Sequence, residues 1–171
     1  MKIRCVIDTH VHADHVSGGR RLAEATGADY VLHESAGARL QFRGIKEDEE
    51  LDLGNVRIQV LHTPGHTPEH MSLLVTDKTR GPEPWFLLSG HTLMVGDLGR
   101  TELASSAEEG ARSLFRCIQK LKNLPDYLEV LPEWQAQLDH RFRAPLQPRV
   151  WHREGRGICT PHAGEHTLAA C

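Results

Sequence analysis

The chain has 171 residues, a formal net charge of -3 at neutral pH and an isoelectric point of about 6.4. This length suffices for one domain with a substantial hydrophobic core, and the slight acidity offers no basic face to nucleic acid. No apolar run approaches the roughly 20 residues that a membrane helix needs, and the N-terminal residues contain no signal-peptide core. We therefore expect neither a nucleic-acid partner nor insertion into a membrane.

The predicted elements follow from hydrophobic period and turn residues. Short apolar or alternating runs predict strands, and apolar residues at helical spacing predict helices. Gly27 ends the first helical pattern, and Gly54 with Asn55 supplies a hairpin turn. The predicted elements in chain order are a strand at residues 3–7, a helix at 16–26, a strand at 30–33, a hairpin at 51–61, strands at 71–75 and 85–88, a helix at 106–124 and a strand at 128–131.

The second helix has the clearest start signal. Ser106 and Glu109 form the pattern of a capping box. Five apolar residues then predict its buried face: Ala111, Leu114, Phe115, Ile118 and Leu121. Strands and helices mixed in this order predict an α/β layered domain.

The composition changes after Pro132. Only six of the 39 residues in 133–171 are Leu, Ile, Val or Phe, below the roughly 20% that a packed segment usually carries. We therefore predict a domain over residues 1–132 and a tail of uncertain structure over 133–171.

Cysteine and histidine usage differ in what they predict. The four cysteines are scattered without CxxC spacing, which is typical of reduced thiols in a cytoplasmic protein. Histidine is unusually abundant, with 12 copies against five lysines, and eight histidines precede residue 92. The histidines are therefore the first candidates for functional residues.

The sequence THVHADH at residues 9–15 directly follows the first predicted strand. Alternate residues of an extended segment point the same way, so His10 and His12 can present two imidazoles to one ion. Asp14 and His15 follow in the turn, where they can hold a neighbouring ion or orient the first ligands. This spacing predicts a metal site.

Two further histidines are candidate ligands from distant segments. Zinc takes about four ligands, and a catalytic site keeps one position for water, so a third protein ligand is needed. His66 in TPGHT is the predicted third ligand, because it lies in a constrained loop just beyond a strand. His91 in LLSGHTLMVGD has the same topological position, and it is either a ligand or a buried histidine with ordinary partners.

Other polar groups are expected to have structural roles. Three histidines should make ordinary polar contacts: His33, His62 and His70. The loop GDLGRTE should be held by its own polar residues: Asp97, Arg100 and Glu102.

HxHxDH followed by TPGHT resembles the signature of the metallo-β-lactamase superfamily, and GHTLMVGDLGRTEL resembles its branch with glyoxalase II and persulfide dioxygenases. The resemblance implies an αββα sandwich, a variety of α/β fold, with metal at one edge of the paired sheets. It implies that His10, His12 and His66 form the first metal site. It also implies that Asp14 and His15 are ligands of the second.

Three departures from the family pattern bear on this reading, which covers about residues 3–132. The family's bridging aspartate falls at His91, so the carboxylate shared by two ions, or bound to iron in persulfide dioxygenases, is replaced. The family's last histidine should fall near Glu133 or Trp134. Relatives also usually have several strands before HxHxDH, so we expect an incomplete sandwich, truncated at the front. Because the bridging carboxylate and the last histidine are replaced, we expect the chain to bind about one ion.

The tail carries a separate hypothesis. Relatives end in a helical segment with Arg-Asn-Arg-Ala-Phe and Glu-Phe-Val patterns. Plausible codons for residues 143–167, read one base out of phase, can give such a segment. We hypothesise that residues after about Pro132 are a frameshifted translation, which an intact reading frame without a nearby insertion or deletion would contradict.

The resemblance favours a metal-dependent hydrolase of a small-molecule thioester, lactone or related acyl substrate. A zinc ion would lower the pKa of bound water to about 7, with Asp14 as the catalytic residue that orients the water or takes its proton. Two alternatives remain: a persulfide dioxygenase-like protein that uses Fe2+, and a metal-binding remnant without catalysis. No oligomeric state is predicted.

Overall fold

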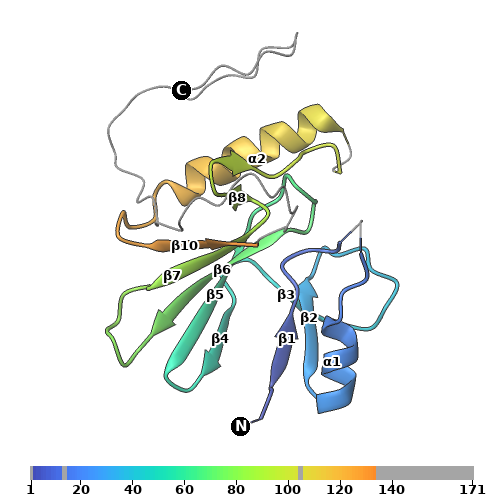
Figure 1. The fold of residues 1–171 in the computed structure, drawn as a ribbon, viewed down its shortest axis with the longest axis vertical. Helices are drawn as coiled ribbons and strands as arrows, with labels where there is room; N and C mark the ends of the chain where they lie inside the picture. The colour runs from blue at the N-terminus through green and yellow to red at the C-terminus, as the bar shows by residue number, and fades with distance from the viewer. Residues whose placement is uncertain (1, 13–14, 104–105, 134–171) are drawn as a thin grey trace, which may run out of the picture.

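The computed structural model describes residues 2–12, 15–103 and 106–133. Two sheets face each other, with one helix outside each, so the layer order is helix, sheet, sheet, helix (Figure 1). Helix α1 (Gly19–Thr26) lies against the first sheet, and helix α2 (Ala107–Leu121) lies against the second. The predicted α/β sandwich is confirmed.

The first sheet is parallel, in the order β1 (Cys5–Ile7), β2 (Asp29–His33), β3 (Arg43–Ile45). The second sheet has the order β10 (Glu129–Pro132), β7 (Phe86–Gly90), β6 (Met71–Asp77), β5 (Val56–His62), β4 (Glu50–Leu53). A small hairpin pairs β8 (Leu93–Met94) with β9 (Asp97–Leu98).

Strand direction places several loops at one edge of the second sheet. β4 to β7 are antiparallel in sequence order, and β10 runs parallel to β7. Because β5, β7 and β10 therefore run the same way, their carboxyl ends lie at the same edge, together with the start of β6. The loops that leave this edge carry His66 and His91, and Glu133 follows β10 there.

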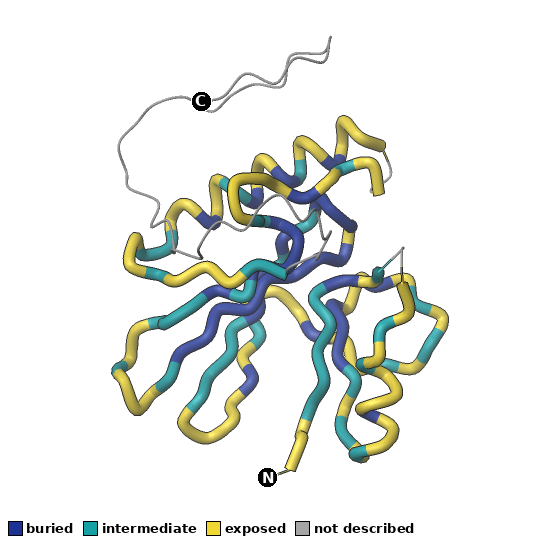
Figure 2. Tube along the Cα trace, viewed as in Figure 1, coloured by how far each residue is buried: buried dark blue, intermediate teal, exposed yellow. Residues whose placement is uncertain are grey.

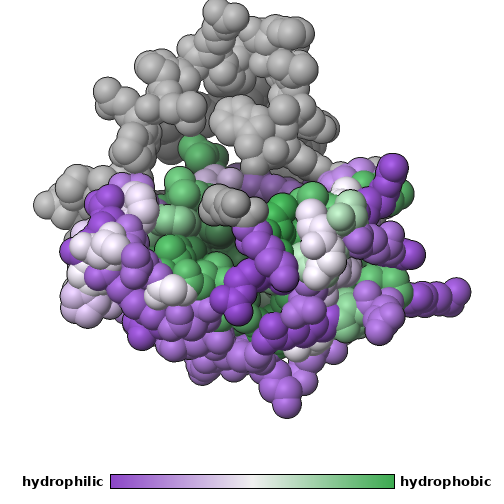
Figure 3. Space-filling view, turned by 90° about the horizontal axis from the view of Figure 1, so that it is seen from below, coloured by the Kyte–Doolittle hydropathy of each residue, from purple (hydrophilic) through white to green (hydrophobic). Residues whose placement is uncertain are grey.

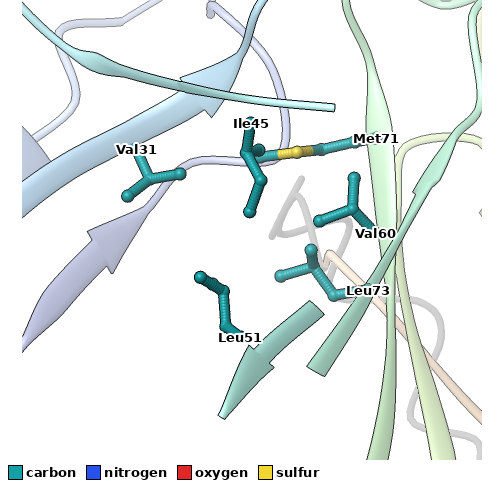
Figure 4. Close-up of a cluster of buried hydrophobic side chains, with 6 residues drawn as sticks. All are labelled: Val31, Ile45, Leu51, Val60, Met71 and Leu73. Atoms are coloured by element: carbon teal, nitrogen blue, oxygen red, sulfur yellow. The ribbon is translucent and has the colours of Figure 1, made fainter. Parts of the chain in front are cut away.

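The main core lies between the sheets. Figure 4 shows side chains from both sheets pointing toward one another. Six buried residues form this cluster: Val31, Ile45, Leu51, Val60, Met71 and Leu73. Fully burying each such side chain contributes about 1.5–3 kcal/mol. A second cluster joins the outer face of the second sheet to α2 through Leu61, Leu74, Leu87 and Leu121.

The distribution of burial agrees with this layering. Buried residues concentrate in the strands of the two sheets and in the loops at their shared edge, while the outer surfaces of the helices are exposed (Figure 2). Figure 3 shows the molecule from below the view of Figure 1. On this face, hydrophobic side chains line a hollow that hydrophilic side chains border. In the described part of the chain, no helix is long and apolar enough to cross a membrane.

The predicted strands are confirmed within a few residues. Three short strands, β3, β8 and β9, are not predicted, because a run of two or three residues shows no hydrophobic period. The first helix begins at Gly19 rather than residue 16. The Ser106 hydroxyl accepts the Glu109 backbone N–H, as the capping pattern predicts.

The predicted face of α2 is partly wrong. Phe115 is 58% exposed, and Ala111 is also exposed. Leu114, Cys117 and Leu121 instead form the buried row. Cys117 was not counted as apolar, although a free cysteine often behaves as a small buried hydrophobe.

Most of the tail predicted for residues 133–171 lies outside the described residues, and so does the frameshift hypothesis. Glu133 alone is described, and its backbone N–H donates to the Gly90 carbonyl. This bond holds Glu133, the residue after β10, beside Gly90, the last residue of β7.

Helix α2 fixes the TPGHT loop by direct contact. The Cys117 thiol donates to the Pro64 carbonyl at 3.0 Å, and burial raises the pKa of this thiol to about 11. A Cβ on Gly65 would lie 2.7 Å from the Leu114 backbone nitrogen, and the φ of Gly65 is +146°. Only glycine fits both the backbone conformation and the close approach of the helix.

The substitution Gly65→Ala should therefore destabilise the protein by about 2 kcal/mol or more, through backbone strain and overpacking. Gly37→Ala is the matched control, because a Cβ there meets nothing within 4 Å and its φ is not in the left-handed region. Urea unfolding of both variants and the wild type provides the measurement. Equal midpoints for Gly65→Ala and the wild type would contradict this account.

Candidate metal centre

The candidate centre forms where the two sheets touch. The loop after β1 runs beside the start of β6, and the Met71 backbone N–H donates to the Thr9 carbonyl at 2.9 Å. His10 follows Thr9 directly and is 2% exposed. This backbone bond therefore brings the HxH segment of one sheet to the loop edge of the other.

Three buried imidazoles from three loops form the first donor set. His10, His66 and His91 follow β1, β5 and β7, and one ring nitrogen of each lies within 4.8 Å of the others. The His10 Nε2 and His91 Nδ1 atoms are 3.1 Å apart. We refer to these residues as the three-histidine set.

A second donor set shares His10. It joins His10 and His12 to the carboxylate of Glu133, again with one donor atom each within 4.8 Å. The Glu133 carboxylate lies 3.9 Å from His10 Nδ1 and 3.8 Å from His12 Nε2. We refer to these residues as the carboxylate set.

Burial disfavours the charged form of two of these imidazoles, and a metal ligand must be neutral. Burial lowers the pKa of His66, against a hydrogen bond to the Arg100 carbonyl that raises it. Burial also lowers the pKa of His12, partly offset by the Glu133 carboxylate. Because a carbonyl can only accept, His66 Nδ1 donates to Arg100 O at 3.0 Å, and its Nε2 keeps the lone pair.

His70 supports the three-histidine set from behind. Its Nε2 accepts the His91 backbone N–H at 3.0 Å. Its Nδ1 then carries the proton and lies 2.9 Å and 3.0 Å from the hydroxyls of Thr63 and Thr92. Burial and the neighbouring imidazoles lower the pKa of His70 well below its usual value. The network therefore fixes one neutral tautomer of His70 and the backbone position of His91.

Glycine at position 90 permits this arrangement. A Cβ there would lie 2.5 Å from His70 Nε2 and 2.9 Å from the Thr9 hydroxyl, and the φ of Gly90 is +53°. Any side chain would displace the ring that positions His91.

The donor chemistry fits a divalent transition metal. Within the described residues, His91 Nε2 is one of two buried side-chain polar atoms without a hydrogen-bond partner. An unsatisfied buried nitrogen costs about 1–3 kcal/mol, and a metal ion is the natural partner for several neutral imidazoles that converge. The histidine cluster can thus hold a metal ion.

The structure divides the predicted ligands between these two sets. His10 belongs to both, His66 to the first and His12 to the second, and His91 faces the centre. His15 is exposed, and its ring lies 4.0 Å from that of His12, centroid to centroid.

Asp14 lies outside the described residues, so the structure does not place the predicted proton acceptor. Arg100 and Glu102 form the expected ion pair in their loop, at 3.7 Å, and the Arg100 carbonyl also reaches His66.

Sequence reasoning missed three contributors: Glu69, His70 and Glu133. Glu69 is 7% exposed, and its carboxylate accepts the Val11 backbone N–H at 2.8 Å. Val11 separates His10 from His12, so this bond holds the backbone between two candidate ligands. Two signals are available in the sequence: Glu69 and His70 lie within the HTPGHTPEH loop, and the family's last histidine is expected near Glu133.

Fold and site together define an αββα sandwich with a histidine-rich centre at the edge of its paired sheets. The family model described as the metallo-beta-lactamase superfamily matches residues 1–131. The chain belongs to this superfamily, and the resemblance seen in HxHxDH and TPGHT is confirmed.

The chain is similar to a hydroxyacylglutathione hydrolase of Methylococcus capsulatus, with 32% identity over 84% of this chain and 53% of that protein. A hydroxyacylglutathione hydrolase of Idiomarina loihiensis is also 32% identical, over 85% and 53%. The chain thus spans about half the length of these curated relatives.

Solved structures show the same relation. A metallo-beta-lactamase from Staphylococcus aureus superposes with a TM-score of 0.73 and 35% identity, over 80% of this chain and 43% of that chain. ETHE1 from Myxococcus xanthus superposes with a TM-score of 0.66 and 31% identity, over 80% and 57%. These matches support the predicted branch of the superfamily.

We predict that Glu69→Ala weakens zinc binding by roughly tenfold or more, the usual cost of losing a group that orients a ligand. Glu69→Gln should stay near the wild type, because an amide oxygen can still accept the Val11 N–H. Zinc affinity is measured by competition with a chromophoric chelator. Equal loss in both variants would show that the carboxylate charge matters rather than the hydrogen bond.

A second prediction concerns pH. Burial, followed by the His62 ring stacked on it at 4.0 Å, lowers the pKa of His33. The unfolded state therefore binds a proton below about pH 6.5 that the folded state resists, so stability falls as pH drops below that value. Urea midpoints of the metal-free protein between pH 7.5 and 5.5 should fall less steeply for His33→Leu than for the wild type. Parallel declines would exclude this contribution.

Proposed function

We propose that this chain is a metal-dependent hydrolase of small acyl substrates, with a thioester as the first candidate class. The observation that carries the proposal is the three-histidine set, in which the buried imidazoles of His10, His66 and His91 converge and His91 Nε2 has no hydrogen-bond partner. The similarity to proteins named hydroxyacylglutathione hydrolase supports the substrate class, since an acylglutathione is a thioester.

The role of each residue follows from its contacts. A zinc ion bound here would activate water near neutral pH and polarise an acyl carbonyl. His66 keeps its Nε2 lone pair toward the centre because its Nδ1 proton is donated to Arg100 O. His70 holds the His91 backbone, and Glu69 holds the segment between His10 and His12.

Asp14 remains the proposed proton acceptor on sequence grounds, because it follows His12 by two positions in HxHxDH. His15 is proposed to orient the neighbouring ligand His12, whose ring it contacts. In this proposal the two residues accept a proton or orient a ligand rather than supply the first ligands.

An iron-dependent dioxygenase is the second candidate, favoured by one observation. The Glu133 carboxylate beside His10 and His12 provides two imidazoles and one carboxylate, the donor combination of many non-haem Fe2+ enzymes. Oxygen uptake with a glutathione persulfide separates this activity from thiol release by a thioester.

We predict that His66→Ala lowers zinc affinity by at least about 100-fold, more than the loss of an orienting group, and abolishes thioester hydrolysis. Asp14→Ala should keep the ion and lose turnover. His62→Ala is the matched control, because His62 is the last residue of β5, just before the His66 loop, and its ring contacts the Pro68 carbonyl outside the centre. Elemental analysis should give about one ion per wild-type chain.

Thiol release from a small panel of thioesters, and opening of lactones, provide the activity measurement for the same proteins. A wild type that binds zinc tightly but hydrolyses none of these would contradict the proposed reaction. Zinc binding unchanged in His66→Ala would contradict the proposed centre itself.

A further inference from the structure

The loop that carries HxHxDH begins and ends beside one side chain, that of Tyr30. This loop, residues 9–16, leads from β1 toward α1, and β1, β2 and α1 pack against one another (Figure 1). Asp8 is the last residue before the loop, and Ser17 is the first residue after it. Both side chains form hydrogen bonds with the phenol of Tyr30, which β2 supplies.

These hydrogen bonds run in one direction. The Gly19 backbone N–H donates to Ser17 Oγ at 2.9 Å, and the Tyr30 hydroxyl donates to Asp8 Oδ2 at 2.6 Å. Because the Tyr30 proton is committed to Asp8, the phenol oxygen accepts from the Ser17 hydroxyl. The series ends on a carboxylate, and a length of 2.6 Å is typical of a hydroxyl bound to a charged oxygen. We refer to Asp8, Ser17 and Tyr30 as the clasp.

Asp8 is attached to β2 through both its side chain and its backbone. Its backbone N–H donates to the Val31 carbonyl at 3.3 Å, next to the bond from Tyr30 to its carboxylate. Burial and the hydrogen bond to Asp8 also raise the pKa of Tyr30, so the phenol remains a donor at neutral pH. The clasp is therefore anchored on the first sheet.

The first residue of α1 packs against all three members of the clasp. A Cβ on Gly19 would lie 3.1 Å from Asp8 Oδ1, from Ser17 Oγ and from Tyr30 Cε2. These contacts are closer than ordinary van der Waals distances, so a methyl group there would push the members apart. A Cβ on Gly18, in contrast, would meet nothing within 4 Å.

The two halves of the loop are held by different sheets. The hydrogen bonds to Met71 and Glu69 described above attach residues 9–11 to the second sheet. The clasp attaches Ser17 to the first sheet. His15 lies between these two attachments, so its position depends on the clasp more than the position of His10 does.

We infer that Tyr30 is a positioning residue, whose hydroxyl closes the HxHxDH loop at its base and thereby fixes the residues that follow His12. Two residues with proposed roles lie in that part of the sequence, Asp14 and His15. The inference rests on the proposed function for its effect on hydrolysis, but not for the closure of the loop.

The first test removes one hydroxyl at a time. Tyr30→Phe keeps the ring and should lower kcat for thioester hydrolysis about tenfold or more, the usual cost of losing an orienting group. Zinc affinity and KM should change less than about threefold, because His10 keeps its own attachment. Ser17→Ala should lose as much kcat, and Ser17→Thr, which retains the hydroxyl, should not. Tyr127→Phe is the matched control, because the Tyr127 hydroxyl donates to an exposed carboxylate, that of Glu83, at 3.4 Å.

Two comparisons separate positioning from a general loss of stability. The double variant Tyr30→Phe with Ser17→Ala should be no slower than either single variant, because both open the same clasp, whereas independent defects multiply. Gly19→Ala retains both hydroxyls and should also slow turnover, while Gly18→Ala should not. Urea unfolding of each variant identifies any loss that is caused by unfolding.

Hydrogen exchange of the Gly19 amide tests the clasp without activity. Because this N–H donates to Ser17 Oγ, its exchange rate, measured by NMR, should rise several-fold in Tyr30→Phe and stay unchanged in Tyr127→Phe. If Tyr30→Phe fails to fold, kcat and KM of Ser17→Ala and Ser17→Thr still decide the matter.

Three outcomes would overturn the inference. Unchanged Gly19 exchange in Tyr30→Phe would show that the phenol does not close the loop. Faster exchange with unchanged kcat, or losses that multiply in the double variant, would show that the clasp is structural only. Zinc affinity that falls as far as kcat would show that Tyr30 acts on the ligands instead. A wild type that binds zinc but hydrolyses no thioester overturns the proposed function and with it the role in hydrolysis, whereas Gly19 exchange still decides the closure of the loop.

Discussion

The structure depends on burying polar rings where two sheets meet. The backbone bond between Met71 and Thr9 joins the sheets at this point, and it places His10 beside the loops that leave β5 and β7. Removing imidazoles from water favours their neutral form, which is the form that binds metal. The same burial that costs folding free energy therefore prepares the donors, and the surrounding hydrogen bonds limit that cost.

Some of these hydrogen bonds orient a ligand directly, and others hold the residue that orients it. His66 is oriented by a carbonyl of the loop after β9, and His91 is held through its own backbone by His70. His70 in turn rests on the hydroxyls of Thr63 and Thr92. Each ligand is thus fixed by a different segment, so the centre is rigid only when both sheets and α2 are packed.

Much of this arrangement could be predicted from local sequence. Strands adjoining HxHxDH and TPGHT placed His10 and His66 at one edge, because strand ends in a layered α/β domain collect there. The row of α2 was harder: Phe115 fits the helical period but is exposed, since the surface beneath the helix accommodates Leu114, Cys117 and Leu121. Helical spacing of apolar residues identifies the apolar face of a helix, but the surface on which the helix packs decides which residues of that face are buried.

The contributors that sequence missed share one property, which is that their role depends on contacts between distant segments. Glu69 matters through Val11, 58 positions away, and Glu133 through two histidines more than 100 positions earlier. No spacing rule connects such pairs. His70 was misjudged for a related reason, since a buried histidine with ordinary partners can still decide where a ligand sits.

The chemical balance of the centre also rests on such a pair. Where the family pattern implies a carboxylate, this chain has His91, and where it implies a late histidine, the described chain ends in Glu133. A centre built from imidazoles alone would leave the charge of a divalent ion unbalanced in a buried place, which is costly. Glu133 brings one negative charge back to the edge of the centre, at a position that remains partly open to solvent. Charge and burial are therefore separated here: the buried half supplies neutral nitrogen, and the open half supplies the carboxylate.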